Sequence, residues 1–378
     1  MSAIQLNSET GKLRGVILHP PGPEVENMTP ENAQKALYSD ILNLTRVTKE
    51  YRQFRAVLEM LTETFEVQTL LAELLGDTAV KTDLLAKICT GEDNLRMLPD
   101  LQFAAPAELA RLLIEGVPLN KDTLTAYLSK ERFTLQPLHN FFFMRDASVV
   151  TGERVLISRM ANHVRDRETT IMDAIFSHHP VFKVETLHLG ANNGATIEGG
   201  DILVARDDLL LIGQSDRTNT QGIDALQEHY KAARRPVDIL VQELPYKPES
   251  FIHLDMVFTL LDRDACMVYK PLILESSRYL TIHITVDNGK ARIRETPNLI
   301  TALSGLGIDL TPISCGGDAD TYTQDREQWH SGANFFCLGP GQVIGYERNV
   351  HTLNAVSYTH LTLPTIILPC RSRGAPGD

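Results

Sequence analysis

The sequence is poor in three features, and each scarcity argues against a class of protein. Its five cysteines are odd in number and form no CxxC pair, which argues against a disulfide framework or a zinc site and favours the reduced thiols of a cytoplasmic protein. No apolar run approaches the roughly 18 residues of a membrane span, and the first residues carry no signal-peptide pattern. We therefore expect no association with a membrane.

Basic residues are also in deficit. The chain has 36 lysine and arginine residues against 48 aspartate and glutamate residues, a formal net charge of −12. A negative surface would not hold a nucleic acid or an anionic membrane, so we expect neither as a partner. A cationic small molecule is compatible with this charge.

The segment between residues 68 and 135 differs in composition from the rest of the chain. Leucine, alanine, glutamate and lysine dominate it, and glycine or proline interrupts each short amphipathic stretch. This pattern predicts an inserted helical domain over residues 68–135. Residues 1–67 and 136–355 are assigned to the α/β domain around it, and the 378 residues provide ample chain for a core.

A strand–turn–strand pattern occurs four times in the α/β part. The turns centre on Gly152, Asp207, Arg263 and Pro340, each between two short apolar runs. Helices are expected between hairpins, over residues 167–176 and 223–233. Units that recur at a spacing of about 50 residues indicate a radial or stacked repeat rather than one open sheet. The sequence therefore predicts an α/β propeller of strand-strand-helix-strand units.

Acidic residues stand at the start of these hairpins. Asp146 and Asp201 each lie six positions before a turn centre, and His253 and Asp255 precede the third hairpin. Equivalent strand starts converge on one axis in a radial repeat, so we expect these side chains to meet in one pocket. Crowded carboxylates need a cation, either a metal ion or a guanidinium, whose planar fork of donors matches two carboxylates.

Two interpretations of this pocket are open at this point. Metal sites normally show several histidines or cysteines at fixed spacing, whereas only His253 and Asp255 lie close here, on one face of an extended strand. This favours an organic cation, and the alternative is a metallohydrolase with Asp146, Asp201, His253 and Asp255 as ligands. Single motifs also have structural explanations, since Glu198–Asp201 with its Gly-Gly pair is typical of a tight turn.

Several short motifs together resemble the arginine deiminase family. The strings Asn140–Asp146, Glu198–Asp201, His253–Asp255 and Arg326–Trp329 occur in the order seen in that family. The resemblance covers nearly everything from residue 8 to residue 354, including the helical insertion. It implies a five-bladed α/β propeller of the pentein type, in agreement with the hairpin repeat.

The resemblance implies a reaction and roles for four residues. The reaction converts L-arginine and water to L-citrulline and ammonia without a cofactor or a metal. Asp146 and Asp255 would hold the guanidinium, His253 would be the general acid and base, and Glu198 would orient and stabilise it. An amidinotransferase or a methylarginine hydrolase of the same superfamily is the nearest alternative.

The resemblance also implies residues for the amino-acid end of the substrate. Asn140, Arg167 and Arg217 match positions that bind this end, with an arginine pairing its carboxylate. Asp201 either contacts the α-ammonium group or supports the site. A homo-oligomer is compatible with the family.

The C-terminal segment departs from the family. The family's nucleophile is a cysteine thiolate in a glycine-rich C-terminal segment, and it forms a covalent thiouronium intermediate. The string Val356–Thr365 instead resembles the in-frame translation of a sequencing-library adapter, so residues 356–378 are predicted to be a non-native tail. Cys370 does not match the neighbours of the nucleophile. We therefore expect negligible citrulline release from this chain, which would make it an inactive arginine-binding protein.

Overall fold

Three small sheets repeat one strand order. The computed structural model describes residues 4–29, 41–94, 97–190, 194–275 and 278–359. In each sheet an antiparallel hairpin is followed by a third strand that pairs parallel with the second. The three sets are β5 (Ser148–Thr151), β6 (Arg154–Ile157) and β7 (Thr186–Leu187); β8 (Ile202–Arg206), β9 (Leu209–Gln214) and β10 (Val237–Glu243); and β11 (Phe258–Leu260), β12 (Ala265–Val268) and β15 (Thr311–Ser314).

Crossover helices make these parallel pairings possible, because a parallel pair cannot be closed by a short turn. Helix α10 (Asp166–His178) joins β6 to β7, and α11 (Thr220–Ala232) joins β9 to β10. Two further sheets complete the set: β1 (Gly15–Leu18) pairs parallel with β2 (Glu63–Glu66) across α3 (Leu44–Leu61), and β16 (Phe336–Gly339) pairs antiparallel with β17 (Gln342–Ile344). All four predicted hairpins are confirmed, whereas closure into five blades stays a prediction.

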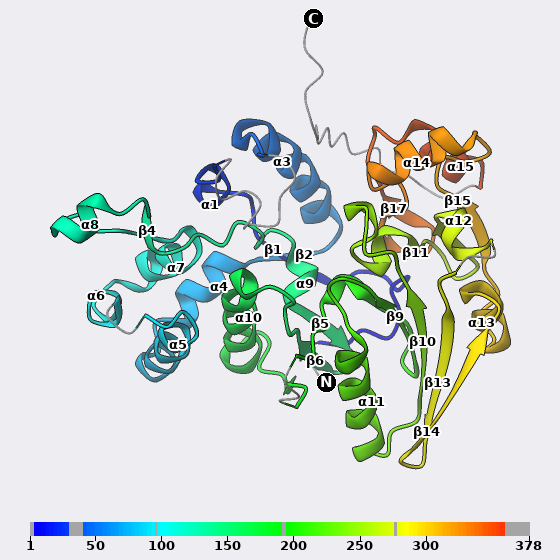
Figure 1. Cartoon of the computed structure of the whole chain (residues 1–378), viewed down its shortest axis with the longest axis horizontal. Coiled ribbons are helices and arrows are strands. Elements are labelled where there is room, and N and C mark those ends of the chain that lie inside the picture. Colours follow the sequence, from blue (N-terminus) through cyan, green and yellow to red (C-terminus); the bar gives the residue numbers. More distant parts are fainter. Residues whose placement is uncertain (1–3, 30–40, 95–96, 191–193, 276–277, 360–378) are drawn as a thin grey trace, which may run out of the picture.

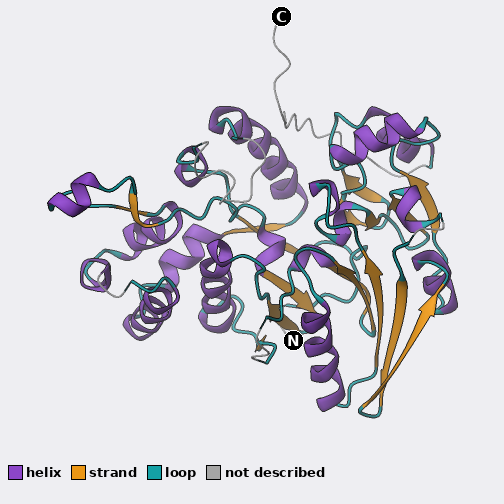
Figure 2. Cartoon of the chain, in the orientation of Figure 1, coloured by secondary structure: helices purple, strands orange, loops and turns teal. Residues whose placement is uncertain are grey.

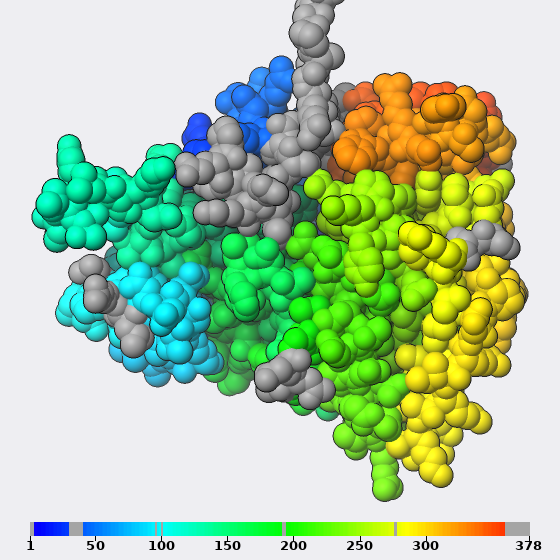
Figure 3. Space-filling view, viewed as in Figure 1, coloured from blue at the N-terminus to red at the C-terminus, as the bar shows by residue number. Residues whose placement is uncertain are grey.

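The segment predicted as a helical insertion is mainly helical and forms one end of the molecule (Figures 1 and 3). Its elements are α4 (Val67–Leu74), α5 (Thr78–Gly91), α6 (Leu98–Gln102), α7 (Pro106–Glu115), α8 (Leu124–Leu128) and a short ladder of β3 (Val117–Pro118) with β4 (Phe133–Leu135). Leu71, Leu85 and Leu113 share one buried cluster with Ile171 and Ile175 of α10. The insertion is therefore packed against the α/β part through α10.

One hairpin was not expected from the sequence. Strands β13 (Thr281–Asp287) and β14 (Lys290–Thr296) lie between β12 and β15 in the chain, and β13 pairs with β10. They extend the β8–β10 sheet to five strands, the long ribbon in orange in Figure 2. The turn is Asn288–Gly289, and both residues have positive φ, of 49° and 74°. An Asn-Gly pair between β-type runs is a strong hairpin signal.

Two helices flank the fourth hairpin. Helix α14 (Thr321–Trp329) precedes β16, and α15 (Val350–Tyr358) crosses residue 355, the predicted end of the α/β domain. Residues 360–378, most of the predicted tail, lie outside the described residues. No helix in the described ranges combines the length and the apolar character that crossing a bilayer needs. The remaining helices are α1 (Pro23–Glu26), α9 (Met144–Ala147), α12 (Lys270–Ile273) and α13 (Leu299–Gly305).

Candidate active site

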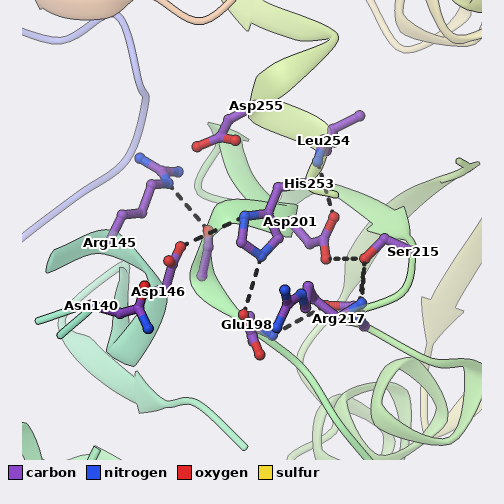
Figure 4. A network of polar contacts seen from close by, with 12 residues as sticks. Asn140, Arg145, Asp146, Glu198, Asp201, Ser215, Arg217, His253, Leu254 and Asp255 are labelled. Carbon is purple, nitrogen blue, oxygen red and sulfur yellow. Dashed lines mark hydrogen bonds and ion pairs between the residues drawn. The ribbon is translucent and has the colours of Figure 1, made fainter. Parts of the chain in front are cut away.

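The chain segments that lead into three hairpins bring the predicted acids and histidine together (Figure 4). Asp146 lies on α9 before β5, Glu198 immediately precedes the short turn Gly199–Asp201 before β8, and His253 and Asp255 precede β11. His253 Nε2 lies 3.2 Å from Glu198 Oε2, and its Nδ1 lies 3.8 Å from Asp146 Oδ1. Asp146, Glu198 and His253, which are far apart in the chain, thus lie close together.

Two glycines allow these segments to approach so closely. A Cβ atom on Gly199 would lie 1.9 Å from the carbonyl oxygen of Arg145, and one on Gly200 would lie 2.5 Å from His253 Nδ1. Any side chain at either position would push the Glu198 turn away from α9 and from the histidine. The Gly-Gly pair is therefore part of the construction of the site and is not only a feature of a tight turn.

His253 is buried between carboxylates. Burial lowers the pKa of its imidazole, but the charge of Asp146 and the hydrogen bond to Glu198 outweigh burial and raise the pKa to about 10. For Asp146, burial raises the pKa of the carboxyl group, and the charges of Arg165 and His253 bring it below its usual value. At neutral pH the pair is therefore an imidazolium beside an ionised carboxylate.

The other two aspartates differ in what surrounds them. Burial raises the pKa of Asp255 to about 6, despite the nearby charges of His253 and Arg145. Burial also raises the pKa of Asp201 to about 7, although Asp201 accepts hydrogen bonds from the Ser215 hydroxyl at 2.6 Å and the Leu254 N–H at 2.9 Å. These bonds tie the Glu198 turn to the His253 segment, so the geometry favours the supporting role for Asp201.

Sequence reasoning missed Arg165, which has the closest contacts with the acids. Its Nη1 donates to Asp146 Oδ2 at 2.7 Å and lies 3.9 Å from Glu198 Oε2, while Nη2 donates to Glu168 at 2.8 Å. The carboxylates of Glu168 and Asp146 outweigh burial and raise the pKa of this guanidinium. A signal was present, because Arg165 and Glu168 are spaced as neighbours on a helix.

Arg167 lies away from the acids. Successive residues of a helix are about 100° apart, so Arg165 and Arg167 point to different sides of this helical segment. The Arg167 guanidinium pairs with Glu92 of the insertion at 2.7 Å and donates to the Gln136 carbonyl. Burial lowers the pKa of Arg167 to about 10. Its assignment to the substrate carboxylate stays a prediction, and Arg165 is the arginine that donates a hydrogen bond to Asp146.

Asn140 and Arg217 flank the cluster. The Asn140 carbonyl accepts a 3.4 Å hydrogen bond from Arg165, and its side chain lies beside Asp146 in Figure 4. Arg217 lies next to Glu198 in the same view, and its buried Nε has no partner among the described residues. Asn140 and Arg167 also line a cavity of about 820 Å³ between the insertion and the α/β part.

The cluster satisfies the spacing of a metal site as well as that of a guanidinium site. One ligand atom each from Asp146, Glu198 and His253 lies within 4.8 Å of the others. Two carboxylates and one imidazole are donors that a divalent ion accepts. In this structure the guanidinium of Arg165 meets the same two carboxylates. The observed contact is therefore an ion pair of Asp146 with a guanidinium of the chain itself, and a metal ion is the alternative ligand of the cluster.

The described cysteines lie elsewhere. Cys89, Cys266 and Cys315 are buried in apolar clusters, and the Cys337 thiol contacts backbone carbonyls. Burial raises the pKa of Cys266 and of Cys315 to about 12 and that of Cys337 to about 11. A thiol must ionise to act as a nucleophile. None of the thiols in the described ranges is therefore suited to attack a substrate at this cluster.

Fold and site together define a class: an α/β protein of repeated hairpins that holds a guanidinium among buried carboxylates. The family model for arginine deiminase matches residues 34–375. The chain is 30% identical to an arginine deiminase of Listeria welshimeri over 99% of this chain and 96% of that protein. It is 33% identical to one of Rhodococcus opacus over 92% of this chain and 88% of that protein. The chain therefore belongs to the arginine deiminase family.

A solved structure supports the fold independently. An amidinotransferase of Microseira wollei from saxitoxin biosynthesis superposes with a TM-score of 0.53, at 13% identity, over 97% of this chain and 92% of that chain. An identity this low shows the fold alone. The likeness confirms the α/β, pentein-type fold class expected from the sequence.

Proposed function

We propose that this site binds the guanidinium of L-arginine for hydrolysis to L-citrulline and ammonia. One observation carries the proposal: the carboxylates that converge here already hold a guanidinium, that of Arg165, at 2.7 Å from Asp146. Membership of the arginine deiminase family supports the same substrate and reaction. The substrate is a cation, in agreement with the net charge of −12.

The proposed roles follow from position and charge. Asp146 and Asp255 would hold two edges of the substrate guanidinium, as carboxylates do in bidentate pairs. His253, protonated at neutral pH, would give its proton to the departing ammonia and then, as a base, activate water. Glu198 is fully buried and accepts from Ala161 N–H at 2.9 Å, which fixes it in place to orient His253. Asn140, Arg167 and Arg217 would bind the amino-acid end, as the resemblance implies.

The covalent step needs a thiolate. In the proposed reaction its sulfur bonds to the guanidinium carbon, ammonia leaves with the proton from His253, and water then displaces the sulfur. The described cysteines do not supply this group, and Cys370 lies outside the described residues. The expectation of negligible turnover rests on the adapter-like string Val356–Thr365 and stays a prediction. We propose that the described residues account for binding and proton transfer.

Calorimetry and a product assay together test the proposal. We expect L-arginine to bind the wild type, and Asp255→Asn to weaken binding at least about tenfold by removing one charged partner. Asp238→Asn is the matched control, because Asp238 pairs with His283 at 2.6 Å in a different sheet. The control should bind like the wild type. Failure of the wild type to bind arginine would contradict the proposal.

The product assay separates the remaining possibilities. Citrulline release should not exceed a no-protein control. Release above it would show that a nucleophile is present after all, and Cys370→Ser would then decide whether it is that thiol. A guanidinylated acceptor, formed when an amine is added, would favour the amidinotransferase, and stoichiometric bound metal would favour the metallohydrolase.

We also propose the domain division and the location predicted from the sequence. An insertion over residues 68–135 agrees with the run of helices from α4 to α8. A cytoplasmic location is supported by the four described cysteines, which are all free thiols.

A further inference from the structure

The segment that carries His253 and Asp255 is held at both ends by one side chain from elsewhere in the fold. Gln328 of α14 is 1% exposed, and its amide nitrogen donates to the Ser250 carbonyl at 3.0 Å and to the Met256 carbonyl at 2.7 Å. These two carbonyls stand on either side of His253 and Asp255 in the chain. The side-chain amide orientation is fixed, because a reversed amide would place its oxygen against two carbonyl oxygens.

Other hydrogen bonds also fix this segment. The Leu254 N–H donates to Asp201 at 2.9 Å, and the Asp255 carbonyl accepts from Asn334 at 3.0 Å and from the Thr259 hydroxyl at 3.3 Å. Among the described residues, the His253 ring forms a hydrogen bond with Glu198 at 3.2 Å and approaches Asp146 to 3.8 Å. The position of the ring therefore depends on where the backbone of residues 250–256 is held.

The oxygen of the Gln328 side-chain amide, unlike its nitrogen, is poorly matched to its surroundings. This Oε1 atom is buried and has no hydrogen-bond partner among the described residues. A buried acceptor without a partner costs stability, so an apolar side chain would suit the core better at this atom. A glutamine supplies two donor hydrogens at this position, whereas an apolar residue of the same size supplies none.

We propose that Gln328 is a positioning residue, which holds residues 250–256 so that the His253 ring stays against Glu198 and Asp146. It touches neither the substrate position nor the reacting groups and acts through the backbone on both sides of His253. This inference rests on the proposed function for its link to arginine. Its geometric part concerns the free protein and is tested without any ligand.

The test substitutes Gln328→Met, which keeps the length of the side chain and removes both donors. Gln324→Met is the matched control, since Gln324 lies on the same helix and its amide also donates to two carbonyls, those of Gly317 at 3.3 Å and Ala319 at 3.1 Å. That loop does not belong to the site. Both variants lose an equivalent pair of bonds, so a general loss of stability affects both.

The decisive measurement is the titration of His253 in the free protein, followed by NMR of histidine-labelled chain. Asp146, Glu198, Asp201 and Asp255 set the proton affinity of this ring, so the affinity reports its distance from them. We expect the Gln328→Met substitution to lower the proton affinity of His253 about tenfold, one pKa unit, and Gln324→Met to leave it unchanged. An unchanged titration in Gln328→Met would overturn the proposal, and so would an equal shift in both variants.

A second variant covers the outcome in which Gln328→Met fails to fold. Gln328→Asn keeps the amide but is one methylene shorter and cannot reach both carbonyls. It should shift the His253 titration in the same direction by a smaller amount, and no shift in the folded Asn variant would overturn the proposal.

Arginine affinity, measured afterwards, should fall in step with the shift. If the wild type binds no arginine, the proposed function fails while the positioning role of Gln328 is still decided by the titration.

Discussion

In the proposed reaction, His253 acts first as an acid and then as a base. Because its pKa is raised to about 10, the ring carries its proton at neutral pH, when arginine would arrive. A protonated ring beside Asp146 and Glu198 is poised to give a proton to a leaving ammonia first and to accept one from water afterwards. The order of these two proton transfers thus follows from the two carboxylates on either side of the ring.

The Asp255 carboxyl group predicts how arginine binding depends on pH. Its pKa is raised to about 6, and only the ionised form attracts a guanidinium. Arginine affinity should therefore be constant above about pH 7 and fall about tenfold by one unit below the pKa, as the carboxylate becomes protonated. Calorimetry from pH 8 to pH 5 measures this. The weak binding of Asp255→Asn should lack the step, and a flat wild-type profile would show that Asp255 does not contact the substrate.

At the scale of residues, the sequence predicted the clustered acids but not Arg165, the arginine that pairs with them. Asp146, Asp201, His253 and Asp255 were found because each lies at the start of a repeated hairpin, and the repeat sets their position in space, whereas Glu198 was assigned through the resemblance to the arginine deiminase family. Arg165 was missed because it belongs to a helix start outside that repeat, and its spacing from Glu168 predicts an ion pair along the helix but no contact with Asp146. Which arginine faces the acids is decided by the rotation of the helix against the sheets, which local patterns do not specify.

Among the elements, the contact between the insertion and α10 includes a charged pair. The guanidinium of Arg167 is nearly fully buried and meets Glu92 of the insertion, whose carboxylate is one-third exposed, at 2.7 Å. Removing one partner of such a pair leaves the other charge buried without compensation, whereas removing both can be nearly neutral. The pair is therefore predicted to show strong coupling rather than large net stabilisation.

A double-mutant cycle tests that coupling. Glu92→Gln alone should destabilise the protein by about 2 kcal/mol, less than a fully buried pair because Glu92 retains contact with water. Arg167→Met together with Glu92→Gln should recover at least half of that loss, measured as the free energy of unfolding in urea. Equal and additive losses would mean that the two side chains do not interact. The Arg111–Glu108 pair, exposed on α7, provides a control that should contribute little.

The success of prediction at the scale of elements varied with the kind of signal. The four hairpins were predicted because short apolar runs around a polar turn specify a pair of strands without help from distant parts. The hairpin of β13 and β14 was overlooked although local signals were present: apolar and polar residues alternate in β13 (Thr281–Asp287) and at the start of β14 (Lys290–Thr296), and the Asn288–Gly289 turn joins them. The pairing of β13 with β10 depends on the tertiary fold, which a local sequence pattern does not specify.

For the whole molecule, the buried histidine predicts a decline of stability in alkali. Folding raises the pKa of His253 from an ordinary value of 6.5 to about 10, so the folded chain binds this proton more tightly than the unfolded chain. The contribution to the free energy of unfolding is therefore fully present below about pH 6.5 and is lost as the pH rises through about 10. Asp201 and Asp255, whose pKa values are raised to about 7 and about 6, act in the same direction at lower pH.

Urea unfolding between pH 7 and pH 9.5 measures this decline. The wild type should lose about 1 kcal/mol per pH unit over part of this range, the slope expected for one proton. His253→Gln should show a shallower slope, and His283→Gln, which changes a histidine of another sheet, should keep the wild-type slope. A wild-type slope in His253→Gln would mean that other groups cause the decline.

The path of the chain through β13 and β14 has a consequence for how the protein unfolds. Between the second and third strands of one sheet, the chain leaves to complete the edge of the neighbouring sheet and then returns. Neither sheet is formed by one continuous stretch of sequence, so neither is able to unfold as an independent unit. The chain therefore links the region that carries His253 to the region that carries Glu198 more than once. We expect both parts of the candidate cluster to be lost in the same unfolding transition.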